Sequence, residues 1–367
     1  MAKSKAPVVL FLGAGASADI GFPTSKQFVE NIGLDPYNQN LLNSNFGNRA
    51  NLLNAAYKHI QIKDIEGVYN FLRAYENIPQ IQLMSDRFKE TQNRDGSNSL
   101  RRYLNDISSL ERTLNQILHR SYDYVPQAHE KKAVEIYAPL FEFLLKSNIF
   151  GDLHELAIYT TNYDVVIEEM FKLSFIRDNY DVIDGFGREE KSDAMIYDDL
   201  EFNRSGKNER PIIKLYKLHG SMNWAIRKND NVLVKNIASA FVHDNYTSPI
   251  IAYPGDHNIK PRDEFKKLNA HFEQDLRQAE RCIVIGFSFR DWDGINQLFK
   301  QVMGKYNKKL FVEISGLRPK LRGNTVDLFS NFTGRYEYHS GGIKKLEQKL
   351  RKKYQNISRR EEEMKRV

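Results

Sequence analysis

A glycine-rich turn follows the first apolar run of the chain, Val8–Leu12. Residues 13–18 read Gly-Ala-Gly-Ala-Ser-Ala and fit the dinucleotide-binding pattern G-x-G-x-x-G/A. In that pattern Gly13 allows the tight turn, Gly15 the close approach of a pyrophosphate, and Ala18 close packing of the next element. Phosphate would then bind backbone N–H groups at a helix start. The alternative is a strand–helix turn without a ligand, because no second strand ends in an acidic residue about 20 positions later.

Two more polar segments follow apolar runs, Thr160-Thr-Asn162-Tyr-Asp164 and Lys217-Leu-His219-Gly220-Ser221. Ligands of open α/β sheets bind outside the carboxyl ends of the strands, so these side chains are candidates for a site. A histidine before a glycine suits a general base, because it titrates near neutrality and the glycine leaves room for a substrate. For residues 160–164 the alternative is an Asx turn that caps the next helix. For His219 the alternative is a structural histidine.

The fourth segment, Gly286-Phe-Ser288-Phe-Arg290-Asp291, follows the most strand-like run of the chain. It combines a glycine turn with a hydroxyl group and therefore suits a ribose or a phosphate. A simple turn at a strand end is the alternative interpretation.

Short β-branched or aromatic runs recur along the chain, separated by stretches long enough for crossover helices. This alternation predicts an α/β fold with a Rossmann-like, doubly wound parallel sheet. The predicted strands are Val8–Leu12, Leu156–Thr161, Ile212–Leu218, Pro249–Tyr253, Arg281–Phe287 and Lys309–Ile314.

Helical periodicity dominates residues 41–150, where no chemistry-bearing motif occurs, and predicts an inserted helical subdomain or an oligomer surface. Residues 1–40 and 151–340, which carry the glycine turn and the other three segments, then form the Rossmann-like domain, with a helix expected to begin near Thr24 or Ser25. Residues 341–367 repeat apolar positions at helical spacing from Ile343 to Ile357 and predict an amphipathic helix, which docks either on the body or on another chain.

The composition is that of an ordinary globular protein, with 41% hydrophobic and 28% charged residues among 367. No uncharged apolar run approaches the length of a membrane span, and no signal peptide is evident, so we expect a cytoplasmic protein. Cys282 is the only cysteine, which excludes an internal disulfide and a cysteine zinc cluster. The net charge of +7 is concentrated in the C-terminal segment, and we do not expect direct binding of nucleic acid.

The glycine turn 13–18 and the segments 160–164, 217–221 and 286–291, in this order, resemble the sirtuin family. The resemblance is in particular to its bacterial branch of NAD-hydrolysing defence proteins. The resemblance implies a Rossmann-like site in which Asn162 holds the nicotinamide ribose and a water molecule and His219 is the catalytic base. It also implies that Asp164 contacts the nicotinamide amide. The further residues that it assigns to NAD+ binding are Gly13, Ala14, Gly15, Ser17, Gly286 and Ser288.

Two departures from the family bear on the substrate. Protein deacylases of the family carry a four-cysteine zinc module and an acidic–aromatic–arginine continuation of the glycine loop. Here one cysteine is present, and Gly21-Phe22-Pro23 leads to Thr24-Ser25-Lys26. Both departures count against acyl-lysine peptide binding and leave NAD+ cleavage intact, with NAD+ as substrate and no metal.

The resemblance therefore implies an NAD+ glycohydrolase that forms nicotinamide and ADP-ribose as a gated effector of anti-phage defence. The alternatives are a protein deacylase or ADP-ribosyltransferase, a non-catalytic module that binds NAD or ADP-ribose, and a basic nucleic-acid-binding protein. Because unrestrained NAD+ hydrolysis kills its host, we expect a homo-oligomer. Some family members work with a separate partner protein, so the resemblance also implies a candidate partner from the same defence operon, such as a hexameric HerA-type DNA-translocating ATPase or a short Argonaute. The sequence does not identify the trigger.

Overall fold

The computed structural model describes the core of the chain, and several other segments lie outside the described residues. Residue contacts divide the chain into two compact units. One comprises Met1–Phe22, Tyr122–Ala252 and Lys260–Val367, and the other Pro23–Ser121 and Tyr253–Ile259. The described residues are 8–24, 27–28, 117–118, 121–122, 125–146, 155–188, 195–204, 210–235, 246, 250–251, 262–289, 294–316 and 329–366.

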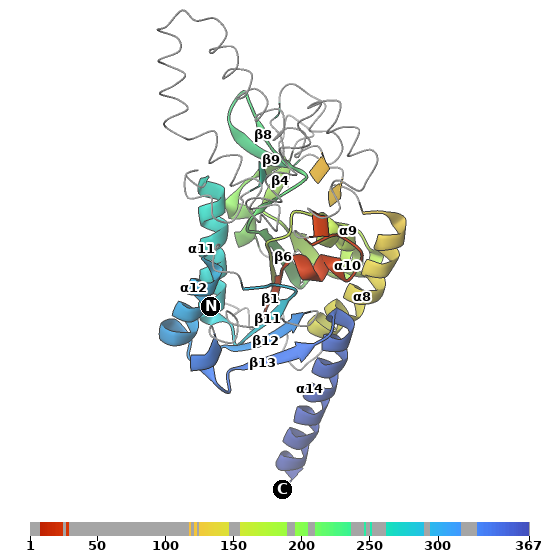
Figure 1. Cartoon of the computed structure of the whole chain (residues 1–367), viewed down its shortest axis with the longest axis vertical. Helices are drawn as coiled ribbons and strands as arrows, with labels where there is room; N and C mark the ends of the chain where they lie inside the picture. The colour runs from red at the N-terminus through yellow and green to blue at the C-terminus, as the bar shows by residue number, and fades with distance from the viewer. Residues whose placement is uncertain are drawn as a thin grey trace, which may run out of the picture. The chain divides into compact units, whose positions relative to one another are not determined.

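The first unit is built on a seven-stranded sheet in which every neighbouring pair is parallel (Figure 1). The predicted doubly wound α/β fold is therefore confirmed. The strands, in spatial order, are β13 (Tyr336–Ser340), β12 (Phe311–Gly316), β11 (Arg281–Ile285), β1 (Val8–Leu12), β2 (Glu155–Thr160), β6 (Ile212–Lys217) and β3 (Asp181–Ile183).

The strand order has its switch point beside β1. The chain runs outward from β1 through β2 and then returns to lay β11 on the other side of β1. The register pairs Leu12 with Thr160 and with Ile285, and Thr160 with Lys217. The carboxyl ends of these four strands are thus level, at the edge where open α/β sheets bind their ligands.

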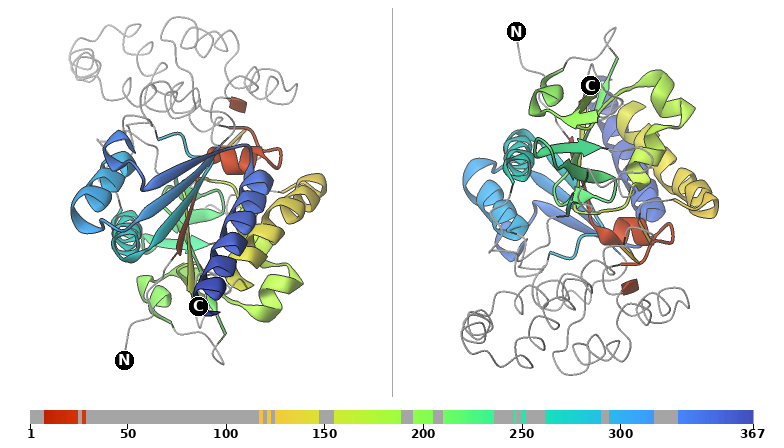
Figure 2. Two further views of the ribbon diagram at one scale, coloured as in Figure 1. Left: turned by 90° about the horizontal axis from the view of Figure 1, so that it is seen from below. Right: turned by 90° about the horizontal axis from the view of Figure 1, so that it is seen from above.

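Helices cover both faces of the sheet, which is why all five residues of β1 are buried (Figure 2). On one face lie α11 (Asp263–Gln278) and α12 (Ile295–Gln301), and Phe272 of α11 stacks on Phe11 with ring centroids 5.0 Å apart. The other face carries α8 (Gln127–Lys146), α9 (Val166–Phe171), α10 (Ser174–Asn179) and α14 (Ile343–Arg366).

Three strand assignments differ from those expected from the sequence. The described part of the run 249–253, residues 250 and 251, does not join the parallel sheet. Instead, β10 (Ile250–Ile251) pairs antiparallel with β7 (Gly220–Ser221). The edge strands β3 and β13 were not predicted, because both are short and carry polar residues. A small antiparallel sheet was also missed, formed by β4 (Phe186–Arg188), β5 (Met195–Tyr197), β9 (Val232–Lys235) and β8 (Trp224–Arg227).

Most of the predicted helical subdomain, residues 41–116, lies outside the described residues. Its C-terminal part, α8, packs on α9 and α14 of the sheet-containing unit, although the sequence grouped it with the inserted block. In the second unit, the side chains of Thr24 and Gln27 each accept a hydrogen bond from the backbone N–H of the other, at 3.3 and 2.9 Å. This capping box confirms Thr24 as a helix start.

The predicted C-terminal amphipathic helix is present as α14, and its apolar stripe faces the protein. Ile343, Leu346 and Leu350 are fully buried, and α14 packs chiefly on α8. The Ile343 N–H donates to Asp19 Oδ2 at 3.0 Å, so Asp19 caps the helix. In the described part of the stripe, docking is thus on the body. No described helix is both long and apolar enough to cross a membrane.

Candidate functional site

The glycine turn after β1 packs directly against the turn after β11. Gly286 adopts a φ of 66°. A Cβ atom on Gly15 would lie only 2.8 Å from the Cα of Gly286. The N–H groups of Gly13 and Gly15 donate to the carbonyls of Ile285 and Gly286 at 2.8 and 2.9 Å. The glycines are therefore needed for contact between two backbones. The sequence had assigned the space at Gly15 to a pyrophosphate.

Asn162 is buried at the carboxyl end of β2, against this glycine turn. Its Nδ2 donates to Gly13 O at 3.0 Å and to Ser17 Oγ at 2.9 Å. Its backbone N–H donates to Thr160 Oγ1 at 3.0 Å. Asn162 Oδ1 is buried and has no hydrogen-bond partner among the described residues. A fixed amide with a spare acceptor is an arrangement that a bound hydroxyl group or water would complete.

Asp164 lies two residues further on and is 5% exposed. Its Oδ1 accepts the Val166 N–H at 3.1 Å, which is the Asx-type cap foreseen as the alternative role of this residue. Burial raises the pKa of Asp164 above its ordinary value, and the Lys217 cation and a hydrogen bond with Ser17 offset this only in part. Ser17 thus contacts both Asn162 and Asp164.

His219 lies in the turn between β6 and β7 and is half-buried. The Leu218 N–H donates to Thr160 O at 2.9 Å, which fixes this turn beside the segment that carries Asn162. Burial lowers the pKa of His219 from 6.5 to about 4, so its imidazole is neutral at pH 7. No described residue forms an ion pair with it.

Gly220 departs from the role expected of it. Its φ is 81°, and a Cβ atom there would collide with the carbonyl oxygen of Ile250 on β10. The glycine is therefore required for the β7–β10 pairing, and the space beside it is filled by protein. The sequence had interpreted it as room for a substrate.

The remaining predicted residues differ in placement. Ala14 is the exposed residue of the glycine turn and begins the five-residue helix α1 (Ala14–Ala18). Ser288 is exposed beyond β11 and has no hydrogen bond to the described site residues, whereas Phe287 packs on Phe11. The structure thus brings Gly13, Ser17, Asn162 and Asp164 into contact and leaves Ser288 apart.

Two further buried residues lie next to the site. Lys217 belongs to a candidate segment of the sequence but was given no role there, and Tyr137 was missed. Lys217 Nζ forms an ion pair with Glu168 Oε1 at 2.9 Å and donates to the backbone oxygen of Asp164. The ring of Tyr137, on α8, is buried close enough to Asp164 and Asp19 for both to help raise its pKa, after burial itself. A lysine at the carboxyl end of a buried strand was the visible signal for Lys217.

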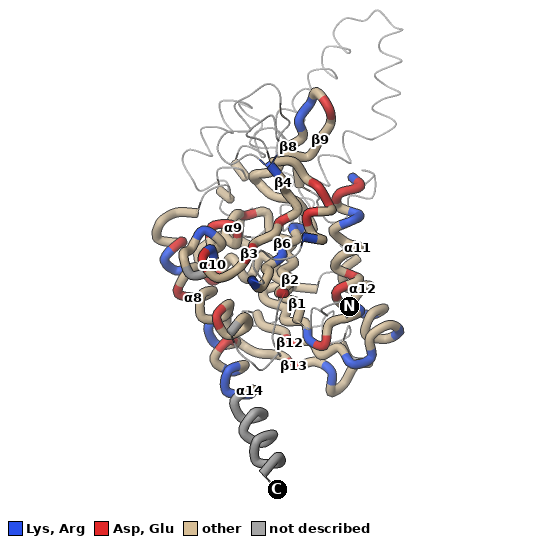
Figure 3. The backbone as a smooth tube through the Cα atoms, turned by 180° about the vertical axis from the view of Figure 1, so that it is seen from behind, with Lys and Arg blue, Asp and Glu red and all other residues tan. Residues whose placement is uncertain are grey.

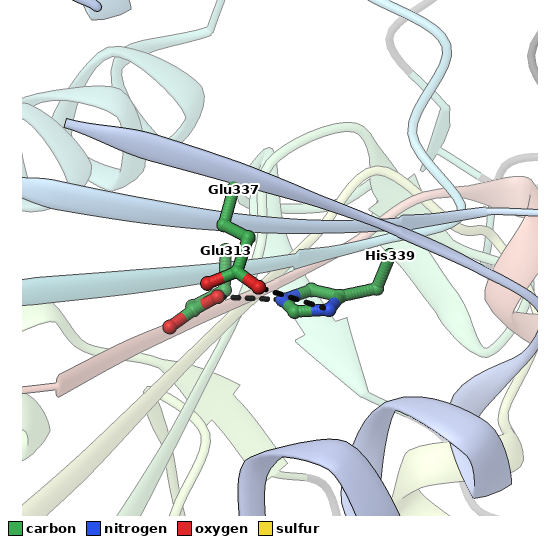
Figure 4. Close-up of side chains that lie close together, drawn as sticks. All are labelled: Glu313, Glu337 and His339. Atoms are coloured by element: carbon green, nitrogen blue, oxygen red, sulfur yellow. Dashed lines mark hydrogen bonds and ion pairs between the residues drawn. The ribbon is translucent and has the colours of Figure 1, made fainter. Parts of the chain in front are cut away.

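One cluster of potential metal ligands occurs among the described residues, and it lies away from this site. Glu313, Glu337 and His339 offer ligand atoms within 4.8 Å of one another (Figure 4). Lys353 Nζ already contacts Glu313 Oε1 at 2.8 Å and Glu337 Oε2 at 2.5 Å, and His339 Nε2 bonds Glu313 Oε2 at 2.6 Å. The lysine cation balances the carboxylates, so the cluster fits an internal ion network better than a metal site.

Charged residues are interspersed over the described elements (Figure 3). Basic and acidic side chains alternate along α11 and neighbouring turns, where Arg262 pairs with Glu264 at 2.8 Å and Lys266 with Asp263 at 2.8 Å. Lys344, Lys345 and Lys349 are exposed on α14. Among the described side chains of this helix, these three lysines present part of the positive charge of the C-terminal segment to solvent.

Comparison with known protein families finds one match in this region. Residues 156–316 match the model of the SIR2-like domain. No curated protein matches the chain. The matched stretch begins in β2, ends with β12, and contains Asn162, Asp164, His219 and Gly286. SIR2-like domains use NAD+, and the match supports a sirtuin-like domain that extends from β2 to β12 of this chain.

Proposed function

We propose that this chain is an NAD+ glycohydrolase that converts NAD+ and water into nicotinamide and ADP-ribose. The observation that carries the proposal is the state of Asn162. Its amide is held by Gly13 and Ser17, and its buried Oδ1, at the sheet edge, has no partner among the described residues. Most buried polar atoms find a partner in the protein or in ordered water, so a spare acceptor at the edge where such sheets bind ligands favours a ligand there.

The chemistry asks little nucleophilic push of the enzyme. The bond between the ribose and the nicotinamide nitrogen breaks with its electron pair on nicotinamide, which leaves neutral from a cationic ring. The transition state has oxocarbenium character, as in glycoside hydrolysis. Asn162 Oδ1 accepts a hydrogen bond from a ribose hydroxyl group or the attacking water, and so orients it.

His219 supplies the base. As the water oxygen bonds to the anomeric carbon, one proton leaves the water, and the neutral imidazole accepts it. The lowered pKa of His219 keeps this imidazole unprotonated through the neutral range, although it also makes His219 a weaker base than a solvated histidine. General bases of this kind contribute about 10²–10⁴-fold to the rate.

Two competing functions are less well supported. A protein deacylase of this family would need a zinc module, and one cysteine, Cys282, is present and buried. A sensor that binds NAD or ADP-ribose without cleaving it needs the glycine turn but not a neutral histidine at the end of β6. The sequence does carry both Asn162 and His219, so hydrolysis accounts for more of the site.

The test is product analysis. Purified full-length protein is incubated with NAD+, and nicotinamide and ADP-ribose are separated by chromatography. Nicotinamide and ADP-ribose in equal amounts support the proposal. Acetylated peptide in the same reaction distinguishes a deacylase, which would form O-acetyl-ADP-ribose. Intact NAD+ under every assembly condition, including with the product of a neighbouring gene, would contradict it.

We further propose that the activity is gated in anti-phage defence by assembly into a homo-oligomer or with an operon-encoded partner. Support comes from the cost of unrestrained NAD+ depletion and from assembly as a common way to bias a site between two states. Light scattering coupled to size exclusion tests it, because a 42.8 kDa monomer would contradict the oligomer. Deletion of Ile343–Val367 tests α14, although its buried stripe places it chiefly on the body.

A further inference from the structure

A buried lysine joins the two strand ends that carry the candidate catalytic residues. Lys217 is the last residue of β6, two positions before His219, and pairs in register with Thr160 at the end of β2. Its side chain is 2% exposed and that of Glu168, on α9, is 9% exposed. A buried charge of this kind is costly unless its surroundings are fixed around it, so its position calls for an explanation.

The contacts of Lys217 define what it holds. Its Nζ donates to the backbone oxygen of Asp164 and lies 2.9 Å from Glu168 Oε1. The second oxygen, Glu168 Oε2, is buried without a partner in the described part of the chain. The pair is therefore incompletely satisfied, unlike an ion pair kept for stability alone. The same ammonium group thus holds the backbone of the turn 162–164 at Asp164, whereas Ser17 contacts the side chains of Asn162 and Asp164.

We propose that Lys217 is a positioning residue, whose buried ammonium group clamps the turn bearing Asn162 and Asp164 to the strand end bearing His219. The proposal rests on the NAD+ hydrolase function for its kinetic consequences, although the clamp itself is a property of the fold. Lys217 does not touch the reacting atoms in this role. It acts through Asp164 and through the backbone that carries Asn162.

The electrostatic setting agrees with the contacts. Four groups on four elements face Asp164, namely Lys217, Ser17, Glu168 and Tyr137. Burial raises the pKa of Asp164, the Lys217 cation opposes this most strongly, and Glu168 adds a smaller increase. Removal of the lysine charge should therefore raise the pKa of Asp164 further, even when the Glu168 charge is removed with it.

The experiment compares the full-length protein with four variants. Lys217→Met removes the charge and strands Glu168, so Lys217→Met/Glu168→Gln is the variant that keeps the interior neutral and the fold testable. Lys217→Arg retains a cation as the conservative rescue. Lys214→Met is the matched control, since it lies on the same strand and pairs with Glu155 at 2.8 Å.

In the double variant we expect kcat for NAD+ cleavage to fall by about 10²-fold, as for a misplaced reacting group, with a smaller change in KM. The acid limb of its pH profile should move up by about one unit. Lys217→Arg should recover part of the rate, and Lys214→Met should match the wild type. A folded double variant with the rate and acid limb of the wild type would overturn the proposal.

A second readout separates this proposal from the proposed function. The Asp164 carboxyl group can be titrated by NMR in protein labelled with ¹³C at aspartate, with Asp164→Asn for assignment. A higher midpoint in the double variant supports the clamp whether or not NAD+ is cleaved, and an unchanged midpoint overturns it. Failure of the wild type to form nicotinamide would instead count against the hydrolase alone.

Discussion

Two clusters of buried charge in the same sheet have opposite outcomes. Asp164, at the carboxyl end of β2, and Glu313, in the middle of β12, both lose hydration, and burial raises the pKa of each. For Glu313 the hydrogen bonds from His339 and Lys353 outweigh burial, so its pKa is lowered. For Asp164 burial outweighs Lys217 and Ser17, so its pKa is raised.

The difference lies in how completely each cluster is paired. Glu313 Oε1 contacts Lys353, and Glu313 Oε2 contacts His339. The network therefore joins β12, β13 and α14 and leaves neither carboxylate oxygen of Glu313 without a partner. Around Asp164, by contrast, Asn162 Oδ1 and Glu168 Oε2 are buried without described partners. Buried polar groups without a hydrogen-bond partner are destabilising. A binding site keeps such groups because the ligand becomes their partner.

The largest expected effect is loss of turnover at the incompletely paired cluster. Asn162→Ala and His219→Ala should each reduce NAD+ cleavage by about 10²-fold or more, because one removes the orienting amide and the other the base. Both should keep the wild-type circular dichroism melt. His271→Ala is the control, since His271 pairs with Asp199 at 3.2 Å. Near-wild-type activity in either site variant would show that its role is assigned wrongly.

The opposite result is expected at the paired cluster. Glu313→Ala leaves Lys353 and His339 without their buried partner and should lower the free energy of unfolding by about 3–5 kcal/mol. Glu337→Ala removes a half-exposed partner and should cost no more than about 1 kcal/mol. Urea denaturation measures both. Equal effects of the two variants would refute the idea that pairing of Glu313 is what stabilises the docking of α14.

The pH dependence of kcat/KM sharpens the comparison. His219 must be neutral to accept a proton, and it protonates only as the pH falls through its lowered pKa of about 4. Burial also raises the pKa of Asp164, so this carboxyl group gains its proton at a higher pH than an ordinary aspartate. From the titration of His219, activity should be flat from about pH 6.5 to 8 and should fall at lower pH. An acid limb centred at pH 6.5, the ordinary pKa of a histidine, would show that burial does not control the pKa of His219. Intrinsic protein fluorescence, measured at each pH, is the control for unfolding.

The smallest effect is expected from metal removal. Lys353 Nζ contacts a carboxylate oxygen of both Glu313 and Glu337, and one cysteine cannot form a cysteine zinc cluster. Activity and the unfolding midpoint should both survive EDTA, and elemental analysis should find no stoichiometric zinc. A one-to-one zinc content that disappears in a His339→Ala variant would identify this cluster as a metal site.

Much of the parallel sheet was predictable from the sequence because its central strands are continuous apolar runs. Val8–Leu12 and Arg281–Ile285 are buried on both faces, and each is followed by a glycine turn. The edge strands escaped prediction for the converse reason. Tyr336–Ser340 alternates polar and apolar residues, and its pairing with β12 is fixed by contacts 20 or more residues away.

The sequence by itself determined the four chemistry-bearing segments and their position after strands, since local composition controls where strands end. Only the tertiary structure decided how those segments meet. Contact between Gly15 and Gly286 depends on the position of β11 beside β1. The lowered pKa of His219 depends on burial by residues that are distant in the sequence. The opposite shifts of Asp164 and Glu313 likewise follow from which cations reach them. Burial and pairing are sums over neighbours in space, and no local pattern encodes those sums.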